Sequence, residues 1–364
     1  MIKILHVISD KNIGGAGKLL LNLISQQNQK SFDIAVAVPS GSLLTNRLTA
    51  LGTHVYESNL SFWSLVKIIR SEGPHIVHTH ASAKARAAAK LCGVAITVNT
   101  KHCATDTAKR AGLCKRAINF VFDRFFTSHT IATAHYAKKR LMLDGIPERK
   151  ISTVINGSLP QKAVSSKEKL ILRKKYGYTA EDFLVGIVAR VEQGKGHEYF
   201  IEAAKLCQSA APQIKFIIVG DGTMMKEIKE SAAELRNLIF TGFLQDVSDI
   251  MNILDANVNC SYISETSSLS LSEGMGLGVI PVVSDCGGNS FMAKDCGIVV
   301  PKKDPQALAS ALVFLASDKE AAQRLKNSAV ARFSKEFTAK AMTEKTERIY
   351  LNLLYKRQNK KQIF

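Results

Sequence analysis

The sequence predicts an α/β protein built from two doubly wound domains that face a central cleft, and three observations favour this fold class. The length of 364 residues and the hydrophobic content of 46% are sufficient for two cores. Short apolar runs alternate with longer helical patterns, as is typical of parallel strands joined by helical crossovers. A cluster of Gly, Pro and Ser at residues 156–166 is typical of a linker between domains.

The elements are expected in the following order. The first half contains six predicted strands, at residues 2–8, 33–38, 54–57, 75–80, 95–100 and 130–134. The second half contains six more, at residues 183–190, 214–220, 237–242, 256–261, 279–284 and 297–300. Helices are predicted between them, as at residues 199–211 and 305–317, and one final helix at residues 338–362. We therefore expect a first domain at residues 1–157, a second at residues 158–336 and a C-terminal segment at residues 337–364.

The net charge of +18 is concentrated in the first half of the chain. Residues 1–160 carry 21 Lys and Arg against 8 Asp and Glu, whereas residues 161–364 carry 28 against 23. This asymmetry predicts an anionic partner for the first half: phospholipid headgroups, a phosphorylated substrate or nucleic acid. Nucleic acid has the least support, because the sequence contains no RNP motif, zinc finger or paired basic helix.

Residues 101–150 hold much of this positive charge. Within them, cations interleave with phenylalanines: Lys109, Arg110, Lys115, Arg116 and Arg124 with Phe120, Phe122, Phe125 and Phe126. This mixture suits a helix that lies in an anionic lipid interface. A solvated basic face whose phenylalanines turn into the core explains it equally well.

Other features limit the cellular setting. The seven cysteines are odd in number and form no C-x-x-C pair, so we expect reduced thiols rather than disulfides or a zinc framework. The start, "MIKILHVISD", does not resemble a signal peptide. No stretch free of Asp, Glu, Lys and Arg reaches 14 residues, so a spanning helix of about 20 apolar residues is not expected. A cytoplasmic protein, free or peripheral on the inner face of the membrane, is expected.

Two motifs of the first half predict ligand contacts. Gly14 and Gly15 in "NIGGAGKLLLNLI" open a helix, whose free N–H groups favour an anion; a tight turn without a ligand is the alternative. In "HIVHTH", His78 and His80 share a face of the strand while His75 points away, and no further ligand follows at a known spacing, so no metal site is expected. His102 in "NTKHC" is a more credible histidine at the cleft, with a structural role as its alternative.

The second half contains two cations at a predicted strand-to-helix connection. Arg190 and Lys195 lie in "VARVEQGKGHEYFIEAA", where they suit a diphosphate: Arg binds as a fork and Lys as a point charge. The nearby "IIVGDGTM" lacks the glycine spacing and the downstream acidic residue of a dinucleotide site, so an NAD enzyme is not expected.

Glu265 and Glu273 lie eight residues apart in "SETSSLSLSEGMGLG". On one helix they would be separated by roughly 12 Å along its axis, more than the roughly 5–9.5 Å of hydrolytic carboxylate pairs. We expect instead that Glu265 lies in a loop, that Ser267 or Ser268 caps a helix, and that Glu273 lies inside that helix. This arrangement suits a clamp on a nucleotide-sugar, with Glu265 at the sugar and Glu273 at the ribose.

Together these motifs resemble the retaining glycosyltransferases of family 4, which have the GT-B fold. The resemblance rests on "VARVEQGKGHEYFIEAA", "FIIVGDGTM", "FTGFLQDV" and "ETSSLSLSEGMGLGVIPVVSDCGGN", with "GGAGKLLLNLI", "HIVHTH" and "VINGS" in the first half. It covers essentially the whole chain. Its specific part is the E-x7-E element together with Arg190 and Lys195.

The resemblance implies a role for each candidate residue. It implies that Arg190 and Lys195 hold the donor diphosphate, that Glu265 contacts the donor sugar and that Glu273 contacts the ribose. It further implies that the amides of Leu269 and Ser270 approach phosphate and sugar, that Gly14 and Gly15 lie by the diphosphate and the acceptor, and that His102 faces the donor sugar. It also implies catalysis without a metal and a C-terminal helix that returns to the first domain. One departure lies beside the sugar, where Thr266, Ser267 and Ser268 replace the Gly-x-Pro of many members.

The resemblance thus implies transfer of a hexose or N-acetylhexosamine, with retention, from a nucleotide-sugar, and UDP is the expected nucleotide. The expected acceptor is a hydroxyl of a membrane-associated glycan or glycolipid in surface polysaccharide biosynthesis. A soluble small-molecule acceptor is the alternative within the same chemistry. Outside it, the alternatives are a nucleic-acid-binding protein and a non-catalytic partner that keeps the fold. The joint presence of Arg190, Lys195, Glu265 and Glu273 argues against that partner.

Overall fold

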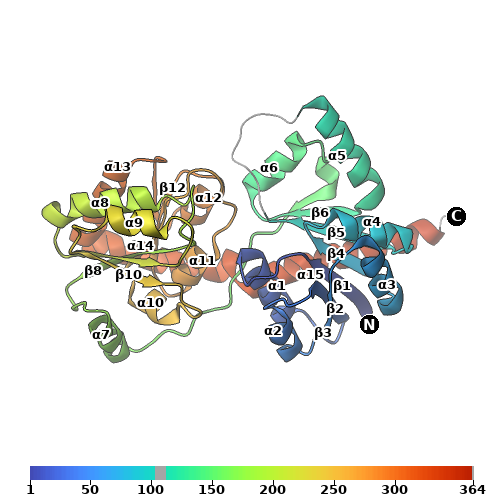
Figure 1. Cartoon of the computed structure of the whole chain (residues 1–364), viewed down its shortest axis with the longest axis horizontal. Helices are drawn as coiled ribbons and strands as arrows, with labels where there is room; N and C mark the ends of the chain where they lie inside the picture. The colour runs from blue at the N-terminus through green and yellow to red at the C-terminus, as the bar shows by residue number, and fades with distance from the viewer. Residues whose placement is uncertain (103–111, 363–364) are drawn as a thin grey trace. The chain divides into compact units, whose positions relative to one another are not determined.

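The computed structural model describes residues 1–102 and 112–362, and the chain divides into two units (Figure 1). Unit 1 comprises Met1–Ser158 and Ala339–Phe364, and unit 2 comprises Leu159–Thr338. Each unit contains one parallel sheet whose strands are joined by helical crossovers, so the predicted doubly wound α/β class is confirmed.

The sheet of unit 1 has seven parallel strands in the order β3-β2-β1-β4-β5-β6-β7. Its strands are β1 (Ile2–Ile8), β2 (Phe32–Pro39), β3 (His54–Ser58), β4 (Ile76–His80), β5 (Ile96–Lys101), β6 (His129–Ala132) and β7 (Ile151–Thr153). Its helices are α1 (Gly15–Gln26), α2 (Thr45–Ala50), α3 (Phe62–Glu72), α4 (Ala83–Leu91), α5 (Leu113–Phe126), α6 (His135–Leu143), the 3-10 turn η1 (Glu148–Lys150) and α15 (Ala339–Gln362). The strand order reverses between β1 and β4, and ligands of open α/β sheets bind at such a switch point.

The sheet of unit 2 has six parallel strands in the order β10-β9-β8-β11-β12-β13. Its strands are β8 (Phe183–Val188), β9 (Ile214–Val219), β10 (Leu238–Gly242), β11 (Ala256–Asn259), β12 (Ile280–Ser284) and β13 (Ile298–Val300). Its helices are α7 (Ser166–Lys175), α8 (His197–Ala210), α9 (Met225–Ser231), α10 (Ser248–Ile253), α11 (Leu269–Gly276), α12 (Asn289–Ala293), α13 (Pro305–Ser317), α14 (Lys319–Arg332) and the π-helical turn η2 (Phe333–Phe337). Here the strand order reverses between β8 and β11.

All twelve predicted strand segments contain strands, and β7 is an additional strand that the sequence pattern did not indicate. It has three residues, of which only Ile151 is apolar, so it shows no apolar run. The strand forms because Ile151 pairs with Thr130 of β6 at the edge of the sheet. A short edge strand of this kind depends on its neighbour rather than on its own sequence.

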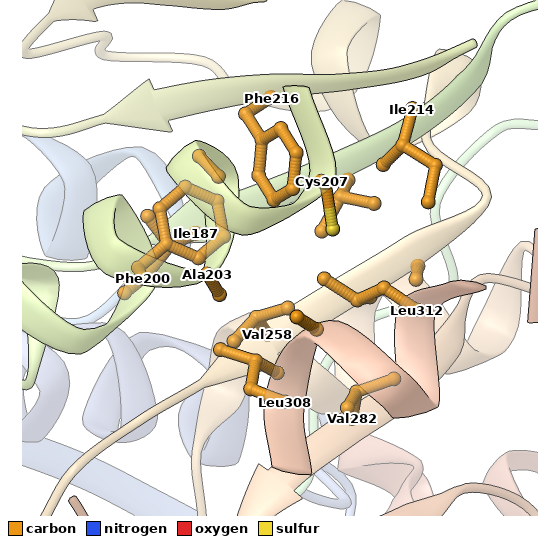
Figure 2. Close-up of a cluster of buried hydrophobic side chains, with 14 of the residues drawn as sticks. Ile187, Phe200, Ala203, Cys207, Ile214, Phe216, Val258, Val282, Leu308 and Leu312 are labelled. Atoms are coloured by element: carbon orange, nitrogen blue, oxygen red, sulfur yellow. The ribbon is translucent and has the colours of Figure 1, made fainter. Parts of the chain in front are cut away.

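One core cluster of unit 2 lies between α8, α13 and one face of the sheet (Figure 2), and a second, which includes Leu184, Ile217 and Ile250, covers the other face. Phe200 and Phe216 are fully buried, with their ring centroids 5.3 Å apart in an edge-to-face arrangement. Leu308 and Leu312 of α13 pack against Val258 and the other strand residues of this cluster. The continuous apolar strands of this half are explained by burial of the sheet on both faces.

Helix α15 belongs to unit 1, which confirms the predicted return of the C-terminal helix to the first domain. Its Tyr350 is fully buried and lies 2.5 Å from Nδ1 of His78, measured from the phenolic oxygen. Near its start, the Thr343 hydroxyl donates to the carbonyl of Leu23 in α1 at 3.2 Å. Within the described residues, no helix combines the length and the apolar character needed to cross a membrane.

Six cysteines of the described residues have free thiols, at positions 92, 114, 207, 260, 286 and 296. Burial raises the pKa of the Cys207 and Cys296 thiols to about 11, so both are protonated at neutral pH. Cys103 lies outside the described residues, as do Lys109 and Arg110 of the predicted basic segment.

Candidate active site

The loop between β8 and α8 carries both predicted cations of unit 2. Arg190 lies two residues after the end of β8 and is exposed, whereas the side chain of Lys195 is 27% exposed. Gly196, the N-cap of α8, has a φ of 79°, and a Cβ at this position would clash with the carbonyl oxygen of Cys260. Only glycine allows this approach, which brings the loop after β8 against the segment after β11. The Tyr262 N–H also ties the two segments together, donating to the carbonyl of Gly194 at 2.9 Å.

Lys195 and Glu265 form an ion pair across this junction, with Nζ 2.8 Å from Oε2. The same carboxylate oxygen accepts from Asn259 Nδ2 at 3.3 Å and from the Ser261 hydroxyl at 3.2 Å. Burial by itself would raise the pKa of Glu265. The charge of Lys195 and the hydrogen bonds from Lys195, Asn259 and Ser261 outweigh burial, so this pKa lies below its ordinary value. Glu265 is therefore a fixed carboxylate at neutral pH, poised to accept hydrogen bonds.

The backbone of Glu265 is also held in place. Its carbonyl accepts from the N–H of Gly288 at 3.0 Å, and Gly287 before it has a φ of 58°. A Cβ at Gly287 would clash with that same carbonyl oxygen. The "CGGN" turn after β12 therefore needs a glycine at this position to support the Glu265 loop.

Helix α11 begins immediately after this loop, as predicted. Ser268 is its N-cap, and the Ser268 hydroxyl accepts from the Leu271 N–H. Leu269 and Ser270 form the first turn and are partly exposed, and the first N–H groups of a helix favour an anion. Glu273 lies inside the helix and is only 2% exposed. The prediction of Glu265 in a loop and Glu273 in a helix is confirmed.

The three residues that replace Gly-x-Pro lie in the connection between Glu265 and α11. Thr266 and Ser267 are buried, with exposed fractions of 8% and 5%, and Ser268 serves as the cap. Two buried residues and a helix cap, all small and polar, therefore occupy the positions of the Gly-x-Pro segment.

In unit 1, Gly14 and Gly15 lie at the start of α1, directly after β1. A Cβ at Gly15 would meet nothing within 4 Å, so protein packing does not require glycine there. The space is tighter at Gly17, where a Cβ would lie 3.0 Å from the Asn12 carbonyl oxygen. Asp10, which the sequence did not single out, lies at the same turn: a Cβ added at Gly14 would be 3.4 Å from its Oδ2.

His102 follows β5 and is partly buried. Its Nε2 lies 2.9 Å from Nδ1 of His80, at the carboxyl end of the neighbouring strand β4. Burial lowers the pKa of His102 to about 4; Asp10 opposes this shift and Lys101 adds to it. His75 is not part of the group: it is exposed, and its Nδ1 accepts from the N–H of Lys3 at 2.9 Å.

A different set of three histidines lies together: ring nitrogens of His6, His78 and His80 are within 4.8 Å of one another. The sequence pattern gave no sign of His6, since its place beside His78 depends on the strand order. The structure thus brings Lys195 and Glu265 together beside α11 in unit 2, and it places His102 and the Gly14–Gly15 turn at the carboxyl ends of β5 and β1 in unit 1.

Comparison with known proteins identifies the family. The model described as Glycosyl transferases group 1 matches residues 168–332, and that described as Glycosyltransferase Family 4 matches residues 13–158. The chain is 28% identical over 348 residues to the UDP-Gal:alpha-D-GlcNAc-diphosphoundecaprenol alpha-1,3-galactosyltransferase of Escherichia coli, covering 87% of this chain and 89% of that protein. It is 29% identical over 168 residues to the O-antigen chain mannosyltransferase C of Escherichia coli, covering 44% of each protein.

Its fold also matches a solved structure. The crystal structure of Anabaena Alr3699/HepE in complex with UDP and glucose superposes with a TM-score of 0.83 at 19% identity, covering 97% of this chain and 100% of that chain. The chain therefore belongs to the family 4 glycosyltransferases, and it is a glycosyltransferase with the GT-B fold.

Proposed function

We propose that the protein is a retaining glycosyltransferase that moves a hexose or N-acetylhexosamine from a UDP-sugar to a hydroxyl of a glycan or lipid-linked acceptor during surface polysaccharide biosynthesis. The observation that carries this proposal is the fixed Lys195–Glu265 pair beside the N-terminus of α11 at the switch point of unit 2. Two relatives named above act in bacterial glycan assembly, one of them on a lipid-linked acceptor with UDP-Gal. UDP is bound in the structural neighbour, which supports UDP as the nucleotide.

Unit 2, which spans Leu159–Thr338 where the sequence predicted a domain at residues 158–336, is the proposed donor-binding domain. Arg190 and Lys195 neutralise the donor diphosphate, and the amides of Leu269 and Ser270 donate to phosphate and sugar. Glu265 accepts from sugar hydroxyls, and Glu273 accepts from the ribose. In unit 1, Gly14 and Gly15 lie by the diphosphate and the acceptor, and His102 faces the sugar.

The proposed reaction is a front-face displacement. The acceptor oxygen forms a bond to the anomeric carbon as the bond from that carbon to the phosphate oxygen breaks, and the departing phosphate takes the acceptor's proton. Negative charge therefore grows on the diphosphate, where Arg190 and Lys195 stabilise it. Glu265 is engaged by Lys195 and by hydrogen bonds, which suits orientation of the sugar better than attack on it. No metal ion is required for these steps.

We expect transfer with retention when the purified protein is given UDP-hexoses, UDP-N-acetylhexosamines and a short-chain polyprenyl-diphosphate-GlcNAc acceptor. Mass spectrometry identifies the product and NMR identifies its anomeric configuration. An α-linked product from an α-linked donor supports the proposal. A β-linked product contradicts retention, and a trapped covalent glycosyl-enzyme contradicts the front-face mechanism. A hydroxylated soluble metabolite, assayed in parallel, tests the alternative acceptor class.

The proposed membrane-facing surface lies on α5 and the end of α6. We define it by six exposed apolar side chains of α5 and the end of α6: Leu113, Ile118, Val121, Phe125, Met142 and Leu143. The two helices are joined where Asn119 Nδ2 donates to the Asp144 carbonyl at 2.9 Å. Phe125 is 59% exposed and Phe120 is 49% exposed. The alternative in which the phenylalanines of this segment pack into the core is therefore wrong for these two.

This surface has the character of an interfacial helix. An exposed apolar stripe on a basic unit suits an anionic bilayer, which takes up apolar side chains and attracts the surrounding Lys and Arg. We propose that it holds the enzyme at the membrane where a lipid-linked acceptor resides.

We expect the protein to float with vesicles of phosphatidylglycerol and phosphatidylethanolamine at low salt, and to be released at about 0.5 M salt, where the Debye length is only a few ångströms. Phe125→Glu should abolish flotation, because it places a charge in the apolar stripe. Ile171→Glu is the matched control: Ile171 is 58% exposed on α7 of unit 2, and its variant should float like the wild type. Failure of the wild type to float, or equal flotation of Phe125→Glu, would exclude the membrane surface and favour a soluble acceptor.

A further inference from the structure

Four histidines of unit 1 gather at the carboxyl ends of three adjacent strands. His6 lies on β1, His78 and His80 lie on β4, and His102 follows β5. In the sheet register His6 lies opposite His78, and His80 lies opposite Thr100 of β5. Because alternate residues share a face of a strand, the rings project to the same side. The side chains of His6, His78 and His80 are at most 3% exposed.

Three of these rings form a hydrogen-bonded chain. Nδ1 of His6 lies 3.2 Å from Nε2 of His80, and Nδ1 of His80 lies 2.9 Å from Nε2 of His102. A neutral imidazole has one N–H donor and one acceptor nitrogen, so each link needs a donor on one ring and an acceptor on the other. His80 is bonded through both nitrogens. When its Nδ1 donates to His102, its Nε2 must accept from His6, and the reverse holds for the other tautomer.

Burial keeps these rings neutral. It lowers the pKa of His6 to about 3 and that of His102 to about 4. The pKa of His80 is lowered well below its ordinary value by burial and by the neighbouring His78, His102 and His6. At neutral pH, the chain therefore has two arrangements, one the reverse of the other.

His78 lies beside this chain without being a link in it. Its Nδ1 is hydrogen-bonded to the Tyr350 hydroxyl, and its Nε2 lies 2.7 Å from the Thr100 hydroxyl. Its ring stacks on His80 with centroids 4.7 Å apart. Since both of its nitrogens already bond to hydroxyls, His78 packs the chain against α15 instead of closing a metal site with His6 and His80.

We propose that His80 and His6 are positioning residues that fix which ring nitrogen of His102 carries the proton. The tautomers of the three rings then change only together, so the one arrangement that the chain adopts in the folded protein sets the hydrogen-bonding role of His102 at Nδ1. This inference rests on the proposed function in one respect, namely that His102 faces the donor sugar. The coupling of the three tautomers does not depend on activity.

The test is a long-range ¹H–¹⁵N spectrum of the full-length protein labelled with ¹⁵N-histidine, at neutral pH and without substrate. His102 is assigned with the His102→Gln variant. We expect one neutral tautomer at each of His6, His80 and His102, with matched donors and acceptors along the chain. His6→Leu, two rings away, should move the two ring nitrogen signals of His102 toward each other. His6→Asn, whose amide can replace Nδ1, should restore them, and His75→Asn outside the chain should leave them unchanged.

Kinetics provides the second readout. His6→Leu should lower kcat by roughly two- to tenfold, the effect of one weakened hydrogen bond, while His6→Asn recovers the rate. Mixed tautomers at His102 in the wild type, or a His102 spectrum that His6→Leu leaves unchanged, would overturn the inference. One tightly bound zinc per chain in the purified protein would also overturn it, because the same nitrogens would then be ligands. Coupled tautomers in a protein that transfers no sugar would leave the inference standing and contradict only the proposed function.

Discussion

We expect Lys195→Ala to lower kcat for sugar transfer by roughly 10²- to 10³-fold, the usual cost of removing one group that stabilises developing charge. The ammonium of Lys195 is held 2.8 Å from Glu265 on a loop that is fixed at Gly194 and Gly196. Its loss removes positive charge where the departing diphosphate is proposed to lie. It also removes the cation that keeps the pKa of Glu265 low, so the buried carboxylate becomes easier to protonate.

Steady-state rates with saturating donor and acceptor measure this effect. Lys205→Ala is the matched control, because Lys205 lies on α8 in an exposed ion pair with Glu202 and should keep kcat within about twofold. Melting temperatures of both variants show whether the fold is retained. A folded Lys195→Ala enzyme with a kcat within about threefold of the wild type would rule out Lys195 as a stabiliser of the leaving group.

The second large effect is expected for Glu273→Gln, which should weaken nucleotide binding by roughly 10- to 100-fold. Hydrogen bonds to a charged group contribute about 1.5–3 kcal/mol, and the amide retains the shape of the side chain while losing the charge. Glu273 lies inside α11 and is only 2% exposed, so the helix and its surroundings hold the side chain in place. The effect should appear in the KM for the donor and in the Kd for the free nucleotide.

Glu227→Gln provides the control for this substitution. Glu227 lies in the first turn of α9 and is exposed, so the same chemical change there should leave both constants unchanged. If Glu273→Gln binds nucleotide as tightly as the wild type, the proposed contact with the ribose is wrong.

The fold was predictable because parallel strands buried on both faces leave continuous apolar runs, which are plain in β8 and in the last four residues of β9. The cap of α11 was predictable because a serine before a helical segment is a local signal. Strand β7, with the sequence IST, forms only because it pairs with β6, and no local sequence pattern indicates that pairing. This three-residue edge strand was therefore not predicted from the sequence.

The site was harder to predict from the sequence than the fold. Lys195 and Glu265 were both singled out, but their direct contact depends on the adjacency of β8 and β11. Asn259 and Ser261 hold the carboxylate of Glu265; Asn259 is the last residue of β11, and Ser261 lies in the loop that follows it. The alternating asparagines of "ANVNCS" were the available signal, since polar residues on a buried strand need partners. The link from His6 to His102 likewise requires the order β1-β4-β5.

The most direct test of the nucleotide-sugar clamp is a thermal-shift panel of UDP, GDP, ADP and common UDP-sugars on the full-length wild type and on Glu273→Gln. A nucleotide at 100 times its Kd stabilises the folded protein by about 2.7 kcal/mol, which corresponds to several degrees in Tm for domains of this size. The predicted result is a rise in Tm with UDP and with UDP-sugars that the variant largely loses. A wild type whose Tm no nucleotide raises, or a UDP shift of equal size in both proteins, would contradict the clamp.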